Sequence, residues 1–321
     1  MKTRLQRLRA RSDLLWSIRS YFRERGYTEL DVPCLIRTPS IEPHIDPFLV
    51  QSQSGERRYL HTSPEYAIKK LLSIGLENVF YLGPCFRDEP KSRLHHPEFT
   101  MLEWYSTGAS LFELMDETEQ LLKSLWSALG SAQVQRHRVD IDFGAPFIRK
   151  TVSEVFEDAV GFCPIQHSTL AALSSRATQA DLRFSENCTS YDDLFHQLFL
   201  NYVEPNLCGS TPTFVWGWPE SQAALAKLTT TEPRVALRFE LYAGGLELAN
   251  AFDELTNAEE QRHRFLTEKA ERKALGKPVF ELDESLLSSL AQIPQTSGIA
   301  LGVDRVLMLL LNAEYLEEVR P

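Results

Sequence analysis

The residues best suited to chemistry lie between two apolar runs. Residues 79–82 and 99–105 are predicted strands, and the breaker pair at 83–84 is predicted to end the first of them. Arg87 leads a charged segment that continues into a basic loop at residues 91–96. An arginine at a strand end, facing such a loop, suits a bound anion with a cation, for example a nucleotide with its metal. The alternative is a β-hairpin with a solvated, charged tip.

A second predicted hairpin holds two further acidic residues. The glycine pair at 244–245 lies between β-like runs and predicts a tight two-residue turn. In that register Glu240 faces Ala249 and Tyr242 faces Glu247. Glu240 and Glu247 then form a diagonal pair on one face of the sheet. Two carboxylates so placed repel each other, and Mg²⁺ is a reasonable shared cation. The alternative is an exposed hairpin with acidic side chains.

Glu254 lies seven residues beyond Glu247 and would point to the other face of a flat strand. If it serves the same site, a bulge or bend must intervene near residues 251–252.

The segment at residues 60–70 is predicted to be a strand end that runs into a helix. Ser63 is suited to the N-cap, Pro64 to the first helical position and Glu65 to the first turn. Helix capping is therefore a sufficient structural account of all three residues.

The elements that would position these residues follow from hydrophobic periodicity. A helix is predicted over residues 5–25, because Leu14, Ile18 and Phe22 recur every four positions, and Gly26 is placed to end it. The other predicted elements are a strand at 27–32, helices at 111–129, 166–180 and 191–203, a strand at 212–219, a helix at 257–275, and a strand and helix within 299–311.

The composition excludes several classes of protein. The chain has 321 residues, 43% of them hydrophobic, and no apolar run long enough for a membrane span or a signal peptide. Its five scattered cysteines form no C-x-x-C pair, which indicates a reduced, cytoplasmic protein. The formal net charge of −10 argues against extensive contact with nucleic acid.

Three stretches resemble the motifs of a known family. F-R-D-E followed by R-x-H-H-P-E-F-T-M-L-E-W-Y (86–105) resembles motif 2 of class II aminoacyl-tRNA synthetases, in the lysyl-tRNA synthetase branch. G-I-A-L-G-V-D-R (298–305) resembles motif 3, and the helix, glycine, strand and proline within 5–33 resemble motif 1, which builds the dimer interface in that family. The resemblance implies an α+β fold with a class II antiparallel sheet flanked by helices, a single catalytic domain over residues 1–321, and a homodimer.

The resemblance also implies a reaction in which ATP activates a carboxylate to an acyl-adenylate that is then transferred to an amine. Arg87 would hold the carboxylate and the α-phosphate, while Phe99 and Arg305 would sandwich the adenine. The implied residues are, for catalysis, Arg87 and Arg305; for substrate, Ser63, Pro64, Glu65, Glu103, Tyr105, Asn250, Glu254 and Ala300; for ATP, Arg87, Asp88, Glu89, His96, Phe99, Glu247, Leu248, Gly302 and Arg305; and for Mg²⁺, Glu240 and Glu247.

One branch of the family fits best. Motif 1 begins within the first few residues, so we expect no anticodon-binding domain before it and no tRNA as acceptor. The elongation factor P–(R)-β-lysine ligases have this trimmed form and attach β-lysine to a lysine side chain of the translation factor. P-E-S-Q-A-A-L-A (219–226) also resembles this branch, and so does Ala300, where lysyl-tRNA synthetases have glycine. The implied partners are elongation factor P and (R)-β-lysine, without tRNA or a membrane.

Two alternatives remain open at this stage. One is a truncated synthetase-like enzyme that activates α-lysine or another amino acid. The other is a non-catalytic paralogue that binds an amino acid and regulates a partner. The chain departs from the usual motifs at Asp88, Pro90, His96 and Ala251, and the first three of these changes fall in the loop expected to contact the nucleotide.

Basic residues crowd the predicted N-terminal helix. They are Lys2, Arg4, Arg7, Arg9 and Arg11. They form either an ordinary solvated face or a docking patch for an acidic partner.

Overall fold

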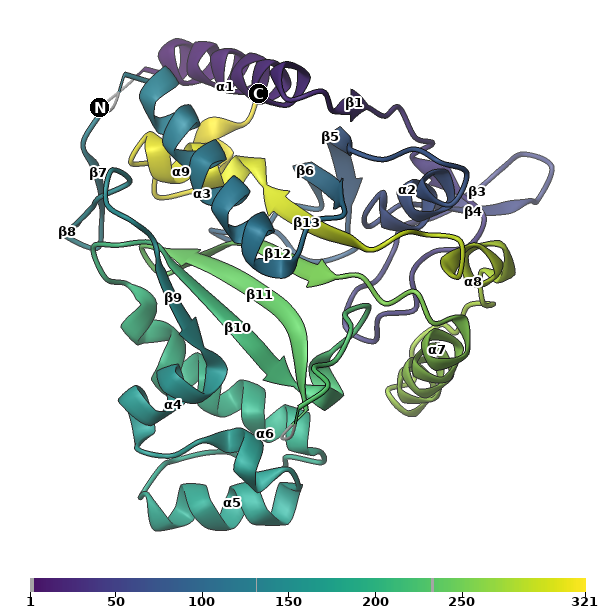
Figure 1. Ribbon diagram of the computed structural model, residues 1–321, viewed down its shortest axis with the longest axis vertical. Coiled ribbons are helices and arrows are strands. Elements are labelled where there is room, and N and C mark those ends of the chain that lie inside the picture. The colour runs from purple at the N-terminus through teal and green to yellow at the C-terminus, as the bar shows by residue number, and fades with distance from the viewer. Residues whose placement is uncertain (1–2, 131, 232–233) are drawn as a thin grey trace. The chain divides into compact units, whose positions relative to one another are not determined.

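The computed structural model describes residues 3–130, 132–231 and 234–321, so Lys2 lies outside the described residues. Runs of mostly antiparallel strands are interspersed with helices along the chain, and the predicted α+β class is confirmed (Figure 1). Within the described ranges, no helix combines the length and the apolar character needed to cross a bilayer.

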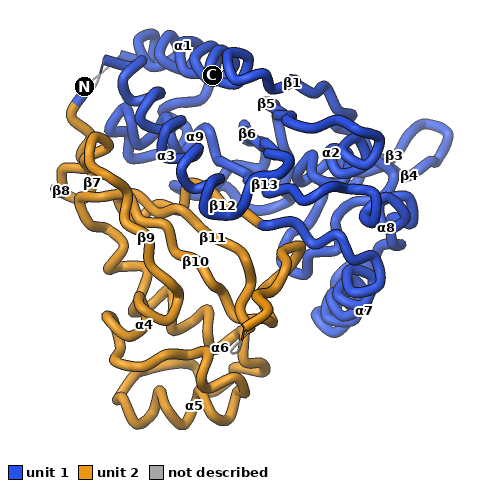
Figure 2. Tube along the Cα trace, in the orientation of Figure 1, with its two compact units in different colours: residues 1–132, 253–321 blue, residues 133–252 orange. Residues whose placement is uncertain are grey.

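The chain divides into two compact units (Figure 2). The first comprises residues 1–132 and 253–321, and the second comprises residues 133–252. The expectation of a single catalytic domain concerns function, and it stays a prediction.

The first unit begins with helix α1 (Arg4–Glu24), close to the predicted range. A capping box at Thr3 starts the helix, and Gly26 follows its end in the left-handed conformation with φ of +80°. The three apolar residues of the predicted face are fully buried. One of them, Phe22, stacks on Phe80 with ring centroids 4.9 Å apart, so α1 is anchored to the strand that leads to Arg87.

Four neighbouring strands lie in the first unit, in the order β1 (Thr28–Glu29), β5 (Val79–Phe86), β6 (Glu98–Thr107) and β13 (Thr296–Gly302). The first pair is parallel and the other two pairs are antiparallel. The strand predicted at 27–32 is reduced to β1, because only two residues pair with β5.

Strand β5 corrects one prediction. It continues through Gly83 and Pro84 to Phe86, so the breaker pair does not end it. A proline can lie in a strand where its nitrogen faces a free edge, and β1 pairs only with the first two residues of β5. The carbonyl oxygen of Pro84 accepts hydrogen bonds from His61 Nε2 at 2.8 Å and from the Tyr81 hydroxyl at 2.9 Å. Side chains therefore supply the hydrogen bonds to the Pro84 carbonyl group at this edge.

The remaining elements of the first unit are a small sheet and several helices. They are β2 (Leu35–Ile36), β3 (Leu49–Gln51), β4 (Arg57–Leu60), α2 (Glu65–Leu72), α3 (Leu111–Ala128), α7 (Ala258–Ala274), α8 (Glu284–Leu290), α9 (Val303–Leu310) and the 3₁₀ turn η5 (Leu316–Val319). Helices α3 and α7 confirm the predictions at 111–129 and 257–275.

The start of α2 differs slightly from its prediction. Pro64 occupies the N-cap, and the first helical residue is Glu65. The hydroxyl of Ser63 nevertheless accepts a hydrogen bond from Glu65 N at 3.0 Å, so it supplies the cap from one position earlier.

The second unit contains a run of neighbouring strands and an aromatic core. Its elements are β7 (Val134–Arg136), β8 (Val139–Ile141), β9 (Ile148–Thr151), α4 (Val152–Val160), α5 (Leu170–Gln179), α6 (Tyr191–Leu198), a π turn (Phe199–Val203), β10 (Thr213–Pro219), β11 (Val235–Ala243) and β12 (Leu246–Asp253). Here β12, β11, β10 and β9 are neighbours in that order. Phe156, Phe195, Phe199 and Trp218 pack together in this core. Helix α5 confirms the helix predicted at 166–180, although it begins only at Leu170, and α6 with the π turn confirms the one at 191–203.

The hairpin of β11 and β12 has the predicted two-residue turn but not the predicted register. Tyr242 faces Glu247 as expected, whereas Glu240 faces Asn250 and not Ala249. An irregularity between Leu241 and Tyr242 shifts the register by one residue. A bulge was predicted near residues 251–252 if Glu254 serves the same site. The bulge in the structure lies closer to the turn than that.

Candidate active site

Buried carboxylates from separate elements of the first unit meet beside strand β6. Alternation along β6 places Glu103 and Tyr105 on one face of the sheet. Both carboxylate oxygens of Glu103 accept hydrogen bonds, from the Ser63 hydroxyl at 2.8 Å and from the Tyr105 hydroxyl at 2.7 Å. These contacts bring together the start of α2 and strand β6, whose residues were predicted to bind the same substrate.

Lys69 joins the other two glutamates of the cluster. Its Nζ lies 2.6 Å from Glu65 Oε1, one helical turn away, and 2.6 Å from Glu254 Oε2, just beyond β12. Its side chain is 1% exposed. Lys69 was not among the predicted site residues, although its position four residues after Glu65 on a predicted helix was a usable signal.

With every carboxyl ionised, the cluster would carry more negative than positive charge. Burial, reinforced by the charge of Glu65, raises the pKa of Glu103 to about 8. Burial also raises the pKa of Glu254 to about 8, although Lys69 acts in the opposite direction. For Lys69, burial lowers the pKa, but Glu254 and Glu65 outweigh that effect and keep it above its ordinary value. Three carboxylates opposed by one ammonium leave a formal excess of two negative charges.

Small residues of β13 line the same face of the sheet. Gly298 lies opposite Tyr105, and Ala300 lies opposite Glu103. A methyl group on Gly298 would come within 2.4 Å of Glu254 Oε1 and of the Tyr105 ring, so only glycine allows these side chains to lie over the strand. On Gly302 a methyl group would meet only the Arg305 side chain, at 3.7 Å, which leaves open space there.

Arg87 follows the end of β5 and turns towards Phe99. Its backbone N donates to Pro97 O at 2.8 Å, which closes the loop between the two strands. Its guanidinium carbon is 5.1 Å from the centre of the Phe99 ring. The Nε atom of Arg87 is buried and has no hydrogen-bond partner among the described residues. A buried donor without a partner is suited to an anionic ligand.

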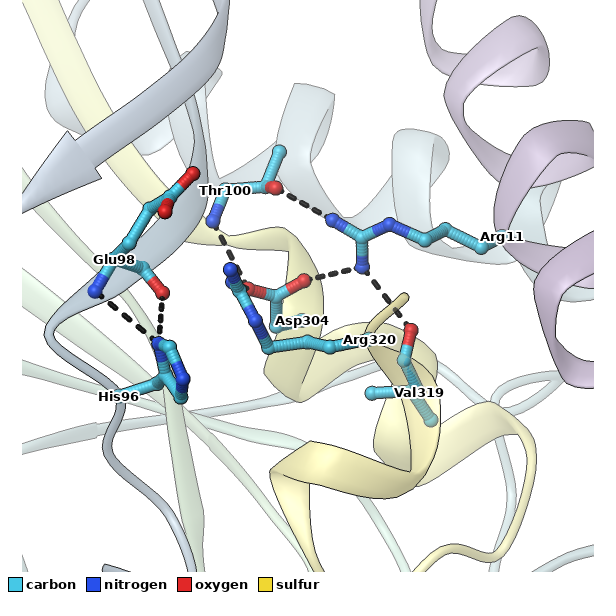
Figure 3. Close-up of polar contacts among 7 residues, drawn as sticks. All are labelled: Arg11, His96, Glu98, Thr100, Asp304, Val319 and Arg320. Atoms are coloured by element: carbon cyan, nitrogen blue, oxygen red, sulfur yellow. Dashed lines mark hydrogen bonds and ion pairs between the residues drawn. The ribbon is translucent and has the colours of Figure 1, made fainter. Parts of the chain in front are cut away.

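The other predicted nucleotide residues of this loop are exposed or half-buried. Asp88 is exposed and its backbone N donates to Asp46 O, whereas Glu89 is half-buried. The Nδ1 atom of His96 lies 2.7 Å from Glu98 O, at the start of β6 (Figure 3). These contacts hold the loop backbone and leave the Glu89 carboxylate in reach of a ligand.

Arg305, in the first turn of α9, is held by a residue that the sequence analysis had treated only as part of the basic loop. An Arg305 nitrogen lies 2.9 Å from His95 Nε2, and His95 Nδ1 lies 3.1 Å from the Ser92 hydroxyl. Because a guanidinium can only donate, Nε2 must accept, and the ring proton therefore sits on Nδ1. His95 thus positions Arg305 from the motif 2 loop.

Asp304, beside Arg305, joins both ends of the chain to β6 (Figure 3). Its carboxylate forms ion pairs with Arg11 of α1 and Arg320 near the C-terminus, and it accepts from Thr100 N at 2.9 Å. Arg11 also donates to the Thr100 hydroxyl at 2.6 Å. This network fixes the start of α9, and so Arg305, relative to β6.

The same contacts correct the interpretation of the basic helix. Arg7 is paired with Glu318 and Arg11 with Asp304, and their side chains are only 12% and 11% exposed. Neither residue belongs to a solvated or docking surface. Arg4 and Arg9 are exposed and remain available.

The β11–β12 hairpin of the second unit holds the remaining predicted residues. Both oxygens of the Glu240 carboxylate are occupied, one by Arg238 and the other by the Tyr242 hydroxyl. Arg238 also donates through Nε to Asn250 Oδ1 at 3.1 Å. Leu248, which was assigned to ATP, is a buried residue at the bulge, and that assignment stays a prediction.

This hairpin has a donor set that suits a magnesium ion bound mainly through phosphates. Across residues 3–130, 132–231 and 234–321, no three His, Cys, Asp or Glu side chains form a metal-binding group. Magnesium, however, commonly takes one or two carboxylates together with phosphate oxygens. Burial raises the pKa of Glu240 to about 7; Arg238 lowers it, and the nearby charge of Glu247 raises it. Each Glu240 oxygen keeps a second lone pair beside its contact with Arg238 or Tyr242, so Glu240 and Glu247 could still share a cation that relieves this repulsion. Their role as magnesium ligands stays a prediction.

Comparison with known families gives the class of the protein. The chain matches the model of tRNA synthetases class II (D, K and N) over residues 2–321. The match spans both units and includes the buried glutamate cluster, Arg87 and Arg305.

Individual relatives are more specific. Proteins named elongation factor P–(R)-β-lysine ligase are 36% identical in Vibrio cholerae serotype O1, over 98% of this chain and 94% of the relative, and 37% identical in Histophilus somni, with the same coverage. The relative of that name from Edwardsiella ictaluri is 39% identical over 96% of this chain and 92% of its own length. The chain therefore belongs to the elongation factor P–(R)-β-lysine ligase family, within the class II tRNA synthetases.

Proposed function

We propose that this protein is an ATP-dependent, AMP-forming ligase that activates (R)-β-lysine and transfers it to a lysine side chain of elongation factor P. Relatives of this chain are named elongation factor P–(R)-β-lysine ligase. Within that family, the observation that carries the proposal is the charge of the buried cluster. Its formal excess of two negative charges matches an amino acid with two ammonium groups. Glu65 would bind the ammonium nearer the reacting carboxylate, and Glu103, Tyr105 and Glu254 would bind the distal one.

The carboxylate of the substrate would extend from this cluster towards Arg87. Glu103 and Phe99 lie on the same face of β6, four residues and about 14 Å apart. That span suits an aminoacyl-adenylate with its ammonium groups at Glu103 and its nucleotide at Phe99. Phe99 and Arg305 would hold the adenine between them, and Glu89 and His96 would contact the adenine or ribose.

Two group transfers make up the reaction. A carboxylate oxygen attacks the α-phosphorus of ATP and pyrophosphate leaves; then the acceptor amine attacks the acyl carbon and AMP leaves. Arg87 would neutralise the charge that develops at the α-phosphate, because its planar guanidinium can donate to both reacting oxyanions. Magnesium, held by Glu240 and Glu247, would supply further charge neutralisation at the phosphates.

Pyrophosphate exchange tests the first step. Wild-type enzyme should exchange labelled pyrophosphate into ATP with (R)-β-lysine and much more slowly with α-lysine. Arg87→Ala should lower the rate at least a hundredfold, equivalent to about 3 kcal/mol or more of lost transition-state stabilisation, while the circular dichroism spectrum stays unchanged. Exchange only with another amino acid would favour a truncated synthetase-like enzyme, and binding without exchange would favour a regulatory paralogue.

Transfer tests the second step and the partner. Purified elongation factor P should gain the mass of one β-lysyl group, and total tRNA should remain uncharged. We also propose a cytoplasmic homodimer, as the motif 1 resemblance and the cysteine usage predict.

A further inference from the structure

We propose that Lys69 is a built-in ammonium group of the amino-acid site, which positions Glu65 and Glu254 and limits the site to substrates that bring two further ammonium groups. This inference deepens the proposed function and rests on it. In this account Lys69 is a positioning and specificity-determining residue, and it takes no part in the chemical steps.

The positioning role follows from geometry. The same nitrogen lies 2.6 Å from an oxygen of each glutamate, so the two carboxylates are held as close neighbours although they come from α2 and from the chain beyond β12. Glu254 is fixed from a second side, because its Oε1 lies over Gly298 where no methyl group would fit. A substrate ammonium thus meets carboxylates whose directions are already set.

The specificity role follows from the charge count. Glu103 accepts from two neutral hydroxyl groups, whereas Lys69 is shared by Glu65 and Glu254. Without Lys69 the site would need three ammonium groups for neutrality, and with it two suffice. Buried charge is tolerated only when it is balanced, so the count selects diamino acids.

Several ionisable groups surround the pair. Glu65 lies on the same helix as Lys69, Glu103 and Tyr105 belong to β6, and Asp253 precedes Glu254. Glu268 of α7 also acts on this region, through its interaction with Glu65. Nearly all of these neighbours are acidic, so removal of Lys69 would leave their charges unopposed.

Three variants separate charge count from local geometry. The readout is calorimetric binding of (R)-β-lysine and of 3-aminohexanoic acid, its analogue without the distal ammonium. Glu254→Gln should weaken (R)-β-lysine binding about tenfold to a hundredfold, because the site then lacks one negative charge. The double variant Lys69→Met/Glu254→Gln restores the formal charge and should recover most of that loss. Lys69→Arg should retain the wild-type preference for the diamino acid.

Lys70→Met is the matched control. Lys70 is the next residue of α2, pairs with Asp283 at 2.6 Å and is 36% exposed, so its loss should leave the preference unchanged. A double variant that binds no better than Glu254→Gln would overturn the inference, as would a Lys70→Met effect equal to that of Lys69→Met. Because the double variant removes both members of an ion pair, it keeps the test valid even if Lys69→Met alone does not fold.

The pH profile gives a readout that a purely structural role would not change. Loss of the fixed cation raises the pKa of Glu254, which Lys69 otherwise lowers, so the acidic limb of substrate binding in Lys69→Met should move to higher pH by about one unit or more. An unshifted limb in a folded Lys69→Met enzyme would contradict the inference. Substrate binding can be measured without turnover. A wild-type enzyme that fails in pyrophosphate exchange would therefore refute the proposed function, but the binding experiments would still test the role of Lys69.

Discussion

At the scale of single residues, the methyl group of Ala300 is a candidate selector of the substrate. Ala300 lies directly across from Glu103 on the face that carries the glutamate cluster. Glycine there would leave space beside the reacting carboxylate for an α-ammonium, whereas alanine fills it. In a β-amino acid the ammonium is one carbon further along and can avoid the methyl group while reaching Glu65.

We therefore expect Ala300→Gly to gain activation of α-lysine by about tenfold to two-hundredfold, the range of about 1–3 kcal/mol that one methyl group typically controls. The measurement is pyrophosphate exchange with α-lysine and (R)-β-lysine for both enzymes. An unchanged ratio between the two substrates would mean that Ala300 only packs against its neighbours.

The raised pKa values of Glu103 and Glu254 predict that substrate binding releases protons. Both carboxyls have pKa values of about 8 in the ligand-free site, so each is largely protonated at pH 7. Substrate ammonium groups favour the ionised form, lower both pKa values and drive the protons off. Calorimetric titration at pH 7 in phosphate and in Tris should therefore give different binding enthalpies. The difference equals the number of protons released multiplied by the difference between the ionisation enthalpies of the two buffers. Glu103→Gln should reduce the difference, and identical enthalpies in both buffers would refute the prediction.

Single residues also show where sequence reasoning succeeded. Glu65, Glu103, Tyr105 and Glu254 were assigned together to one substrate, and the structure places them around one cluster. Their role in binding stays a prediction. Lys69 was missed because a lysine on an amphipathic helix is ordinarily a solvated residue, and only the fold reveals that its surroundings are acidic and buried.

At the scale of elements, the errors arose where backbone geometry depends on distant partners. Strand β5 passes through Gly83 and Pro84 because its outer edge is free of a neighbour at that point, which the local sequence does not encode. The hairpin turn was predictable from its two glycines, but the bulge that moves Glu240 opposite Asn250 was not. Turn residues specify a turn, whereas register also depends on packing against the rest of the sheet.

The Asp304 network ties elements that are far apart in the sequence, and it should contribute strongly to stability. Its partners Arg11 and Arg320 come from α1 and from the C-terminal end. We expect Asp304→Ala to lower the free energy of unfolding by about 3–5 kcal/mol, because it leaves the mostly buried guanidinium of Arg11 without a counter-charge. Urea unfolding measures this.

Glu314→Ala is the control for Asp304→Ala. Glu314 pairs with Arg93 at 3.6 Å, and both side chains are more than half exposed. Removing such a pair should change stability by about 1 kcal/mol or less. Equal effects of the two substitutions would show that the Asp304 network adds nothing beyond an ordinary surface ion pair.

At the scale of the whole molecule, the motif 1 resemblance predicts a homodimer. Leu14 and Ile18 are fully buried within their own chain, so a partner would have to contact the outer side of α1. Trp16 is 72% exposed there. We expect a dimer in sedimentation velocity at micromolar concentration and a shift to monomer in Trp16→Glu. Ile74→Glu, at a residue 76% exposed beyond the end of α2, is the matched control, and a monomeric wild type would contradict the prediction.

Recognition of the acceptor protein is the remaining whole-molecule question, and the electrostatics of α1 make a specific prediction about it. The chain as a whole is acidic, with a formal net charge of −10, yet Arg4 and Arg9 stand exposed on α1. A local basic patch on an acidic protein can orient an acidic surface of the partner, and such steering weakens as salt screens it. Transfer of β-lysine to elongation factor P should therefore slow as ionic strength rises.

The double reversal Arg4→Glu/Arg9→Glu should slow transfer and flatten its salt dependence, because the charges that steer the partner are gone. Arg7 and Arg11 are unsuitable probes, since reversing either would break an ion pair within the chain. Pyrophosphate exchange, which needs no acceptor, should stay at the wild-type rate and so separates docking from activation. Arg183→Glu, at an exposed arginine of the second unit, should change neither reaction. Transfer that ignores both salt and the double reversal would place the acceptor on a different surface, where shape and apolar contact, and not charge, select it.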